Sequence, residues 1–127
     1  FWGSTTSTMD VEVSRANANI VWAGSRISSN GRIHFSTNGG QTFSPTANYT
    51  TATMGAITKL GSHPTEPNTA YAIFSFRGRP KILRTTNLGT SWQDITGFGS
   101  GSTSTNGFPD VAVYCIYVRP DNTNIIW

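Results

Sequence analysis

The stretch Ser36-Thr37-Asn38-Gly39-Gly40-Gln41-Thr42-Phe43 returns 49 positions later as Thr85-Thr86-Asn87-Leu88-Gly89-Thr90-Ser91-Trp92. Both copies follow one order: hydroxyl, any residue, Asn, any residue, Gly, any residue, hydroxyl, aromatic. A second pair of segments, residues 19–23 and 68–72, keeps the same offset without a gap. A fixed period near 50 residues is typical of proteins built from repeated supersecondary units. The sequence therefore predicts a repeat protein.

A third copy of the unit begins near the end of the sequence. Residues 119–127 match residues 63–71 at an offset of 56, and the seven additional residues fall in the Gly- and Ser-rich stretch that precedes them. We therefore expect blade-like repeats over about residues 4–53 and 54–103, with a partial third over 104–127, all belonging to a single domain.

The composition suits a folded β-protein. Thirteen Gly and only 12% charged residues fit short strands joined by tight turns, while four Trp, four Tyr and seven Phe supply the bulky apolar groups that disordered segments lack. The net charge of +3 comes from scattered residues, so nucleic acid is not an expected partner. The sequence has no apolar run of the length that a membrane-spanning helix needs, and we expect no such span.

A few residues invite functional interpretations that we set aside. The local basic cluster of Arg77, Arg79, Lys81 and Arg84 is interpreted as a solvated hairpin with outward side chains. Cys115 lies in the apolar run 111–118 and is predicted to be a buried small hydrophobe. The two histidines, His34 and His63, are too dissimilar in setting to form a metal pair, so each is assigned a structural role. We expect no metal and no cofactor.

Short β-branched and aromatic runs bounded by Gly, Asn and Pro recur along the chain, and helical periodicity is almost absent. Four antiparallel strands in each unit of this length are typical of a propeller blade. A plain β-sandwich is the alternative, but a sandwich has no reason to repeat its loop chemistry in register. The predicted strands are residues 11–13, 56–60 and 111–118 (first), 19–24, 69–75 and 124 onward (second), 32–36 and 81–85 (third), and 42–45 and 91–95 (fourth).

The two octapeptides resemble the Asp-box, or BNR repeat, of sialidases, xyloglucanases and sortilin-type receptors. Ser36-x-Asn38-x-Gly40-x-x-Phe43 and Thr85-x-Asn87-x-Gly89-x-x-Trp92 carry the resemblance. A short polar side chain at the third position can accept hydrogen bonds from the turn, Gly allows positive φ, and the closing aromatic packs onto the blade. Both copies have Asn where the family usually has Asp, which keeps the accepting oxygen and removes the charge.

Residues 63–72 are similar to the Pro-x-x-Pro-Asn-x-x-Tyr-Ala step that precedes the box in sortilin-like and xyloglucanase-like repeats. The resemblance implies an all-β fold of propeller blades, here an incomplete propeller of about two and a half units. It also implies a non-catalytic binding or structural segment of a secreted or cell-surface protein, at an extracellular or cell-surface location. Its implied partners are a protein or carbohydrate ligand and the remaining blades of the parent propeller.

Alternating antiparallel strands place the boxes on one rim of the blades, and the sites of known propellers use the other rim. Arg26, Arg77 and Arg79 are the candidate binding residues of that second rim. A fragment of a propeller glycoside hydrolase is the alternative function. A sialidase-like site would need an arginine triad with a Tyr nucleophile, and a xyloglucanase-like site would need paired carboxylates, for which Asp10 and Asp110 are the candidate catalytic residues. The loops of that rim are residues 25–31, 46–54, 77–80 and 97–109.

Overall fold

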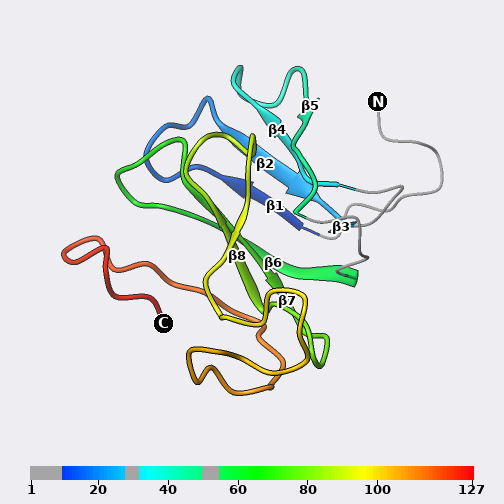
Figure 1. Cartoon of the computed structure of the whole chain (residues 1–127). Coiled ribbons are helices and arrows are strands. Elements are labelled where there is room, and N and C mark those ends of the chain that lie inside the picture. The colour runs from blue at the N-terminus through cyan, green and yellow to red at the C-terminus, as the bar shows by residue number, and fades with distance from the viewer. Residues whose placement is uncertain (1–9, 28–31, 50–54) are drawn as a thin grey trace.

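The computed structural model describes residues 10–27, 32–49 and 55–127, which form an all-β arrangement without a helix (Figure 1). The ends of the first predicted blade and the start of the second fall partly outside these residues. The described ranges contain no helix that could cross a membrane. The strands are β1 (Asp10–Val13), β2 (Val21–Gly24), β3 (Arg26–Ile27), β4 (His34–Ser36), β5 (Ser44–Pro45), β6 (Gly55–Ser62), β7 (Ala70–Phe74), β8 (Ile82–Thr85) and β9 (Gln93–Asp94).

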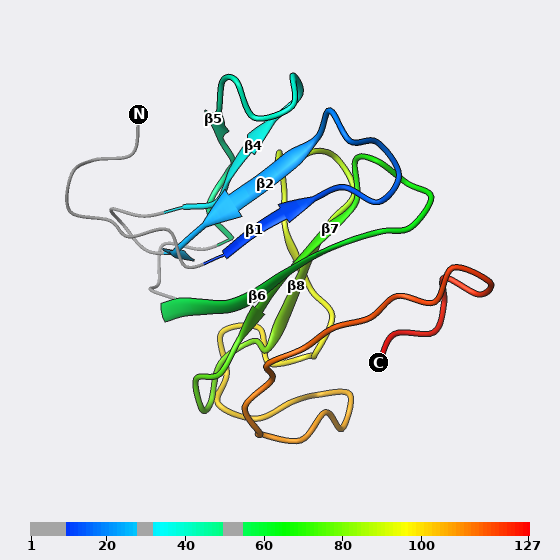
Figure 2. The same ribbon diagram turned by 180° about the vertical axis from the view of Figure 1, so that it is seen from behind.

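These strands make two antiparallel sheets. The first has the order β1-β2-β4-β5, and the second has the order β3-β6-β7-β8-β9. Apart from β3, each sheet is a four-stranded meander, as the sequence predicts for one unit. The short strand β3 was not predicted; it pairs with the start of β6, whereas the rest of β6 pairs with β7 across a register shift between Ile57 and Lys59. This long, shared strand curls the second sheet (Figure 2).

The pairing of the strands repeats with the same 49-residue period as the sequence. Every strand pair of the first sheet has a counterpart in the second whose facing residues are 49 positions further on. Because a slip of one residue would turn each side chain to the opposite face, identical register places equivalent side chains on equivalent faces. Matching pairs include Val13↔Val21 with Ser62↔Ala70, Trp22↔Phe35 with Tyr71↔Arg84, and Phe35↔Ser44 with Arg84↔Gln93.

The main core lies between the two sheets. Trp22 is fully buried there, and alternate residues of β7, including Ala72 and Phe74, face the same cluster. The other face of the second sheet carries a smaller cluster in which Tyr71 packs with Val118 of the third unit. The second sheet is therefore covered on both faces, each by a neighbouring unit.

The third unit begins as the first two do. The amide of Arg119 donates to the carbonyl of Ile125 at 3.1 Å, as Ser14 donates to Ile20 and His63 to Thr69. Tyr117 and Trp127 then exchange two backbone hydrogen bonds, next to an isolated bridge between Val118 and Ile126. The third copy therefore has the same turn as the one that follows the first strand in both complete units.

The predicted strand over residues 111–118 is wrong for most of its length. Only Val118 has a ladder partner among the described residues, and Val111 and Tyr114 are 52% and 70% exposed. An apolar run can become a strand only where a neighbouring backbone supplies hydrogen bonds, and residues 111–116 have no such ladder. Cys115 is consequently exposed, so its predicted burial is also wrong.

Candidate functional site

The two box turns share a set of side-chain hydrogen bonds. The Ser36 hydroxyl accepts from the amides of Asn38 and Gly40 at 3.2 and 2.9 Å, and the Asn38 side-chain oxygen accepts from the Thr42 amide at 2.9 Å. In the second box, the equivalent bonds are 3.3, 2.9 and 3.0 Å long. In each turn two short side chains, the hydroxyl residue and the Asn, satisfy amides that the tight bend leaves without a backbone partner.

Positive backbone angles explain the glycine of each box. Gly40 and Gly89 have φ angles of 89° and 75°, which an L side chain rarely adopts. At Gly89, a side chain would also collide with Thr46, from the end of the first unit. The amide of Ala47 donates to the carbonyl of Gly89 at 2.7 Å. The second box is thus a point at which the two units are joined.

The strands β1 and β6 run side by side, next to the C-terminal segment of the chain (Figure 2). A groove of about 270 Å³ lies between β1, β6 and residues 116–118. We call it the inner groove, because its walls are β1, β6 and the equivalent segment of the third unit. The lining residues are Glu12, Arg15, Lys59, Leu60, Gly61, Ser62, Ile116, Tyr117 and Val118.

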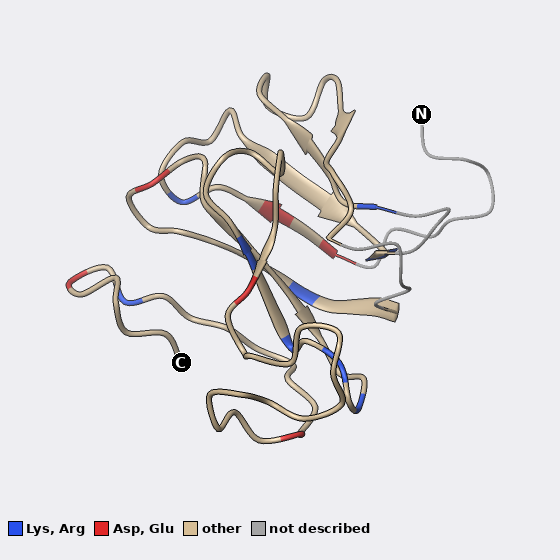
Figure 3. Ribbon diagram, in the orientation of Figure 1, with Lys and Arg blue, Asp and Glu red and all other residues tan. Residues whose placement is uncertain are grey.

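Carboxylates of β1 hold the neighbouring edge of β6. The Asp10 side chain accepts from the amide of Leu60 at 2.6 Å, and the Glu12 side chain accepts from the amide and hydroxyl of Ser62 at 3.2 and 2.7 Å. Lys59 also pairs with Asp10, at 3.3 Å. Figure 3 shows the acidic residues of β1 and the basic residue of β6 on these adjacent strands. The side chains therefore replace a backbone ladder between the two sheets.

Arg15 closes the groove on the side of the third unit. Its guanidinium donates to the carbonyl of Val118 at 3.2 Å and lies over the ring of Tyr117, 5.2 Å from the ring centre. Tyr117 remains 45% exposed. The groove therefore offers cations from Arg15 and Lys59, the carboxylate of Glu12 and an aromatic surface.

The candidate Asp110 lies elsewhere, beside a buried ammonium group. Lys81 is fully buried, which contradicts its interpretation as an outward side chain of a solvated hairpin. Its Nζ donates to the Asp110 carboxylate at 2.5 Å and to the carbonyl of Phe76, and lies 4.7 Å from the ring centre of Phe98. The Lys81 hydrogen bond, with a second from the Gly78 amide, lowers the pKa of Asp110 below its ordinary value.

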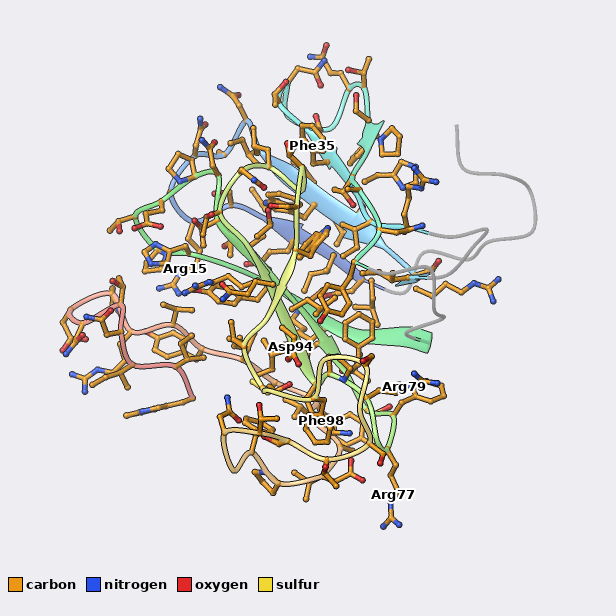
Figure 4. The ribbon with its side chains drawn as sticks, in the orientation of Figure 1. Arg15, Phe35, Arg77, Arg79, Asp94 and Phe98 are labelled. Atoms are coloured by element: carbon orange, nitrogen blue, oxygen red, sulfur yellow. The ribbon has the colours of Figure 1, made fainter. Side chains whose placement is uncertain are left out.

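The other predicted site residues are not gathered at one place. Asp10 is bound to β6, and Asp110 is bound to Lys81. Arg26, Arg77 and Arg79 are exposed, and Figure 4 shows the last two projecting from the loop between β7 and β8. None of these three lines the inner groove.

The residues that do form the groove were missed because its walls come from three separate units. The only hint in the sequence was that Arg15 follows a predicted first strand. Nothing in the local sequence indicates that its side chain lies over Tyr117.

His63 is 4% exposed, and its Nδ1 accepts from the amides of Thr65 and Glu66, so it orders the turn between β6 and β7.

Among the described residues, no group of three or more His, Cys, Asp or Glu side chains is placed to hold a metal ion. Comparison with protein-family models gives no match, and the search of curated proteins gives none either.

Proposed function

We propose that this chain is a non-catalytic binding segment of a β-propeller of the Asp-box type, and that its inner groove engages a protein ligand. Two observations support the propeller: the identical register of successive four-stranded meanders, and the side-chain hydrogen bonds that the two boxes share. The resemblance to sortilin-type receptors supports a secreted or cell-surface location.

The exposed faces of the outermost units support further blades as partners. Val11 and Val13 of β1 are 53% and 52% exposed, whereas their repeat equivalents Leu60 and Ser62 are buried between the units. Trp127 is 72% exposed, although its equivalents, the fully buried Trp22 and the 2% exposed Tyr71, pack on the next unit. Additional units would cover these apolar side chains in the same way.

The proposal of a protein ligand rests on the inner groove. Charges of both signs line the same groove as the exposed Tyr117 ring, over which Arg15 lies. Tyr and Arg are enriched among the residues that dominate protein interfaces. Asp10 and Asp110 each bind an ammonium group and a backbone amide, so no contact of the described residues favours the glycoside hydrolase.

A displayed library of random dodecapeptides, panned on the immobilised chain, tests this proposal. Enriched peptides should bind about tenfold more weakly to Arg15→Ala, since interface arginines often make contributions of that size. Arg32→Ala is the matched control, because Arg32 is exposed and does not line the groove. Circular dichroism of each variant verifies folding. Absence of enriched peptides, or enriched peptides indifferent to Arg15→Ala, would contradict the proposal.

A further inference from the structure

Another cavity, of about 200 Å³, lies where the second unit meets the third. We call it the polar cleft. From the third unit, Thr123, Asn124 and Ile126 line it, and its other lining residues belong to the second unit. The volume is below the range of about 300 to 1,000 Å³ that is usual for drug-sized ligands, so the cleft suits only a small molecule.

Three residues of the cleft are polar where the first unit has apolar side chains. They are Thr69 in place of Ile20, Tyr71 in place of Trp22, and Arg84 in place of Phe35, each pair 49 positions apart. In the first unit, these positions pack into the core between the two sheets. Burying polar groups costs free energy unless they find hydrogen-bond partners, so packing alone does not explain the exchange. A polar ligand in the cleft would explain it.

The cleft is lined by one cation and one carboxylate that are not paired with each other. Nη2 of Arg84 donates to the side-chain oxygen of Gln93 at 2.9 Å, and Nη1 has no hydrogen-bond partner among the described residues. Oε2 of Glu66 accepts from the Thr69 hydroxyl at 3.0 Å, and Oε1 has no such partner. Neither side chain forms an ion pair within the described part of the chain. Both charges therefore remain available to a ligand.

The Tyr71 hydroxyl is close enough to both charges to respond to them. Burial raises the pKa of Tyr71, the guanidinium of Arg84 lowers it, and the carboxylate of Glu66 raises it. The ring packs in the smaller core cluster, but the hydroxyl makes no hydrogen bond with the described residues. A tyrosine hydroxyl can both donate and accept, so it can bind either charged end of a ligand.

His63 supplies a further donor. Its Nδ1 accepts from the amides of Thr65 and Glu66 at 3.3 and 3.0 Å, so the proton of the neutral ring is on Nε2. Nε2 makes no hydrogen bond with the described residues, and His63 lines the cleft. The Thr86 hydroxyl and the Asn124 side-chain amide add donors to the same lining. The cleft therefore offers several neutral donors beside the Arg84 guanidinium.

We propose that the polar cleft binds a small α-amino acid. The Arg84 guanidinium matches its carboxylate, and the Glu66 carboxylate matches its ammonium group. A ligand with a single charge would meet a like charge in the cleft, whereas a zwitterion satisfies both. Among the described lining residues Ile126 alone is aliphatic, so the cleft suits glycine or alanine rather than a large apolar side chain. The polar cleft shares no lining residue with the inner groove and does not depend on its ligand.

The probes are glycine and L-alanine, titrated at constant ionic strength. Acetate, which lacks the ammonium group, and glycinamide, which lacks the carboxylate, are the comparisons. Nitrogen–proton correlation spectra follow the backbone amides of Thr69, Thr86 and Asn124 in the cleft wall. Glycine or alanine should shift these signals, and each comparison should bind at least about tenfold more weakly, because it loses one charge-assisted hydrogen bond. If neither amino acid shifts them at millimolar concentration, or if either comparison binds as tightly as glycine, the proposal is overturned.

Variants separate the two charges from the fold. Arg84→Gln and Glu66→Gln should each weaken the binding of the amino acid by about tenfold or more. Glu66 is exposed, and Gln keeps an acceptor for the Thr69 hydroxyl, so Glu66→Gln should fold as the unaltered chain does. Arg32→Gln is the matched control, because Arg32 is exposed and does not line the cleft. Unchanged binding in Glu66→Gln, or an equal loss in Arg32→Gln, would overturn the proposal, whatever the result for Arg15→Ala.

Discussion

Trp22 of β2 and Trp92, the closing aromatic of the second box, meet edge to face across the two sheets. Their ring centres are 6.3 Å apart, and their planes are inclined at 68°. Edge-to-face geometry adds to the gain from burying the two rings, because the positive edge of one ring meets the negative face of the other. The box therefore does more than close its own turn: it packs one repeat onto the preceding one.

Trp92→Ala should lower the free energy of unfolding by about 3 to 5 kcal/mol, the range for losing a large aromatic side chain from a core. Phe43→Ala, the equivalent change in the first unit, should cost less because Phe43 is only half-buried. Urea denaturation of the two variants measures both losses. Equal losses, or a loss below about 1 kcal/mol for Trp92→Ala, would contradict the proposed role of this ring in joining the units.

Asn87→Ala should lower the free energy of unfolding by about 1 to 3 kcal/mol, since it leaves the Ser91 amide and the Thr85 hydroxyl without their acceptor. Asn87→Asp keeps that acceptor and loses only the donation from Nδ2 to the Ser91 hydroxyl. Thermal denaturation should therefore rank Asn87→Asp close to the unaltered chain and well above Asn87→Ala. The opposite order would refute the assignment of the side-chain oxygen as the group that organises the turn.

Gly89→Ala should be more destabilising than Gly40→Ala. Both place a side chain at positive φ, which costs about 1 to 2 kcal/mol. Only Gly89 also faces Thr46, whereas the nearest neighbours of a side chain at Gly40 are 3.9 Å away. Adding Thr46→Gly, which removes both clashing carbons, to Gly89→Ala should recover part of the extra loss in chemical denaturation when the loss from Thr46→Gly alone is subtracted. The lack of any recovery would show that Thr46 is not its cause.

Much of the fold was predictable from the sequence because each complete unit could be compared with a second copy of itself. Eight aligned residues gave the box turns, and the constant offset gave the strands of both complete units. A turn such as that at Asn38 and Gly40 is decided by local chemistry, so it can be inferred from the sequence of the turn alone.

The predictions from the sequence failed where segments that are far apart in the sequence meet in the structure. The burial of Lys81 depends on Asp110, 29 positions away, and the groove at Arg15 depends on Tyr117 of another unit. The run over residues 111–118 fails for the opposite reason. Its composition favours a strand, but among the described residues only Val118 has a partner for strand pairing.

The pair of Lys81 and Asp110 predicts a loss of stability in acid. The pKa of Asp110 is lowered in the folded state, so its carboxylate contributes stability above the unfolded pKa, and this is lost as the pH falls through the folded value. The window begins near the ordinary aspartate pKa of about 3.9 and extends below it. Thermal melts between neutral pH and this window should show a shallower decline for Asp110→Asn. A decline as steep as in the unaltered chain would exclude a role for Asp110 in the acid response.

Cross-strand proton–proton contacts in nuclear Overhauser spectra give the most direct test of repeated, equivalent sheets. Contacts that place Trp22 opposite Phe35 should recur with Tyr71 opposite Arg84, and those for Val11 and Ala23 should recur with Leu60 and Ala72. The same register in both sheets is the predicted result. A shift of even one residue in one sheet relative to the other would contradict it.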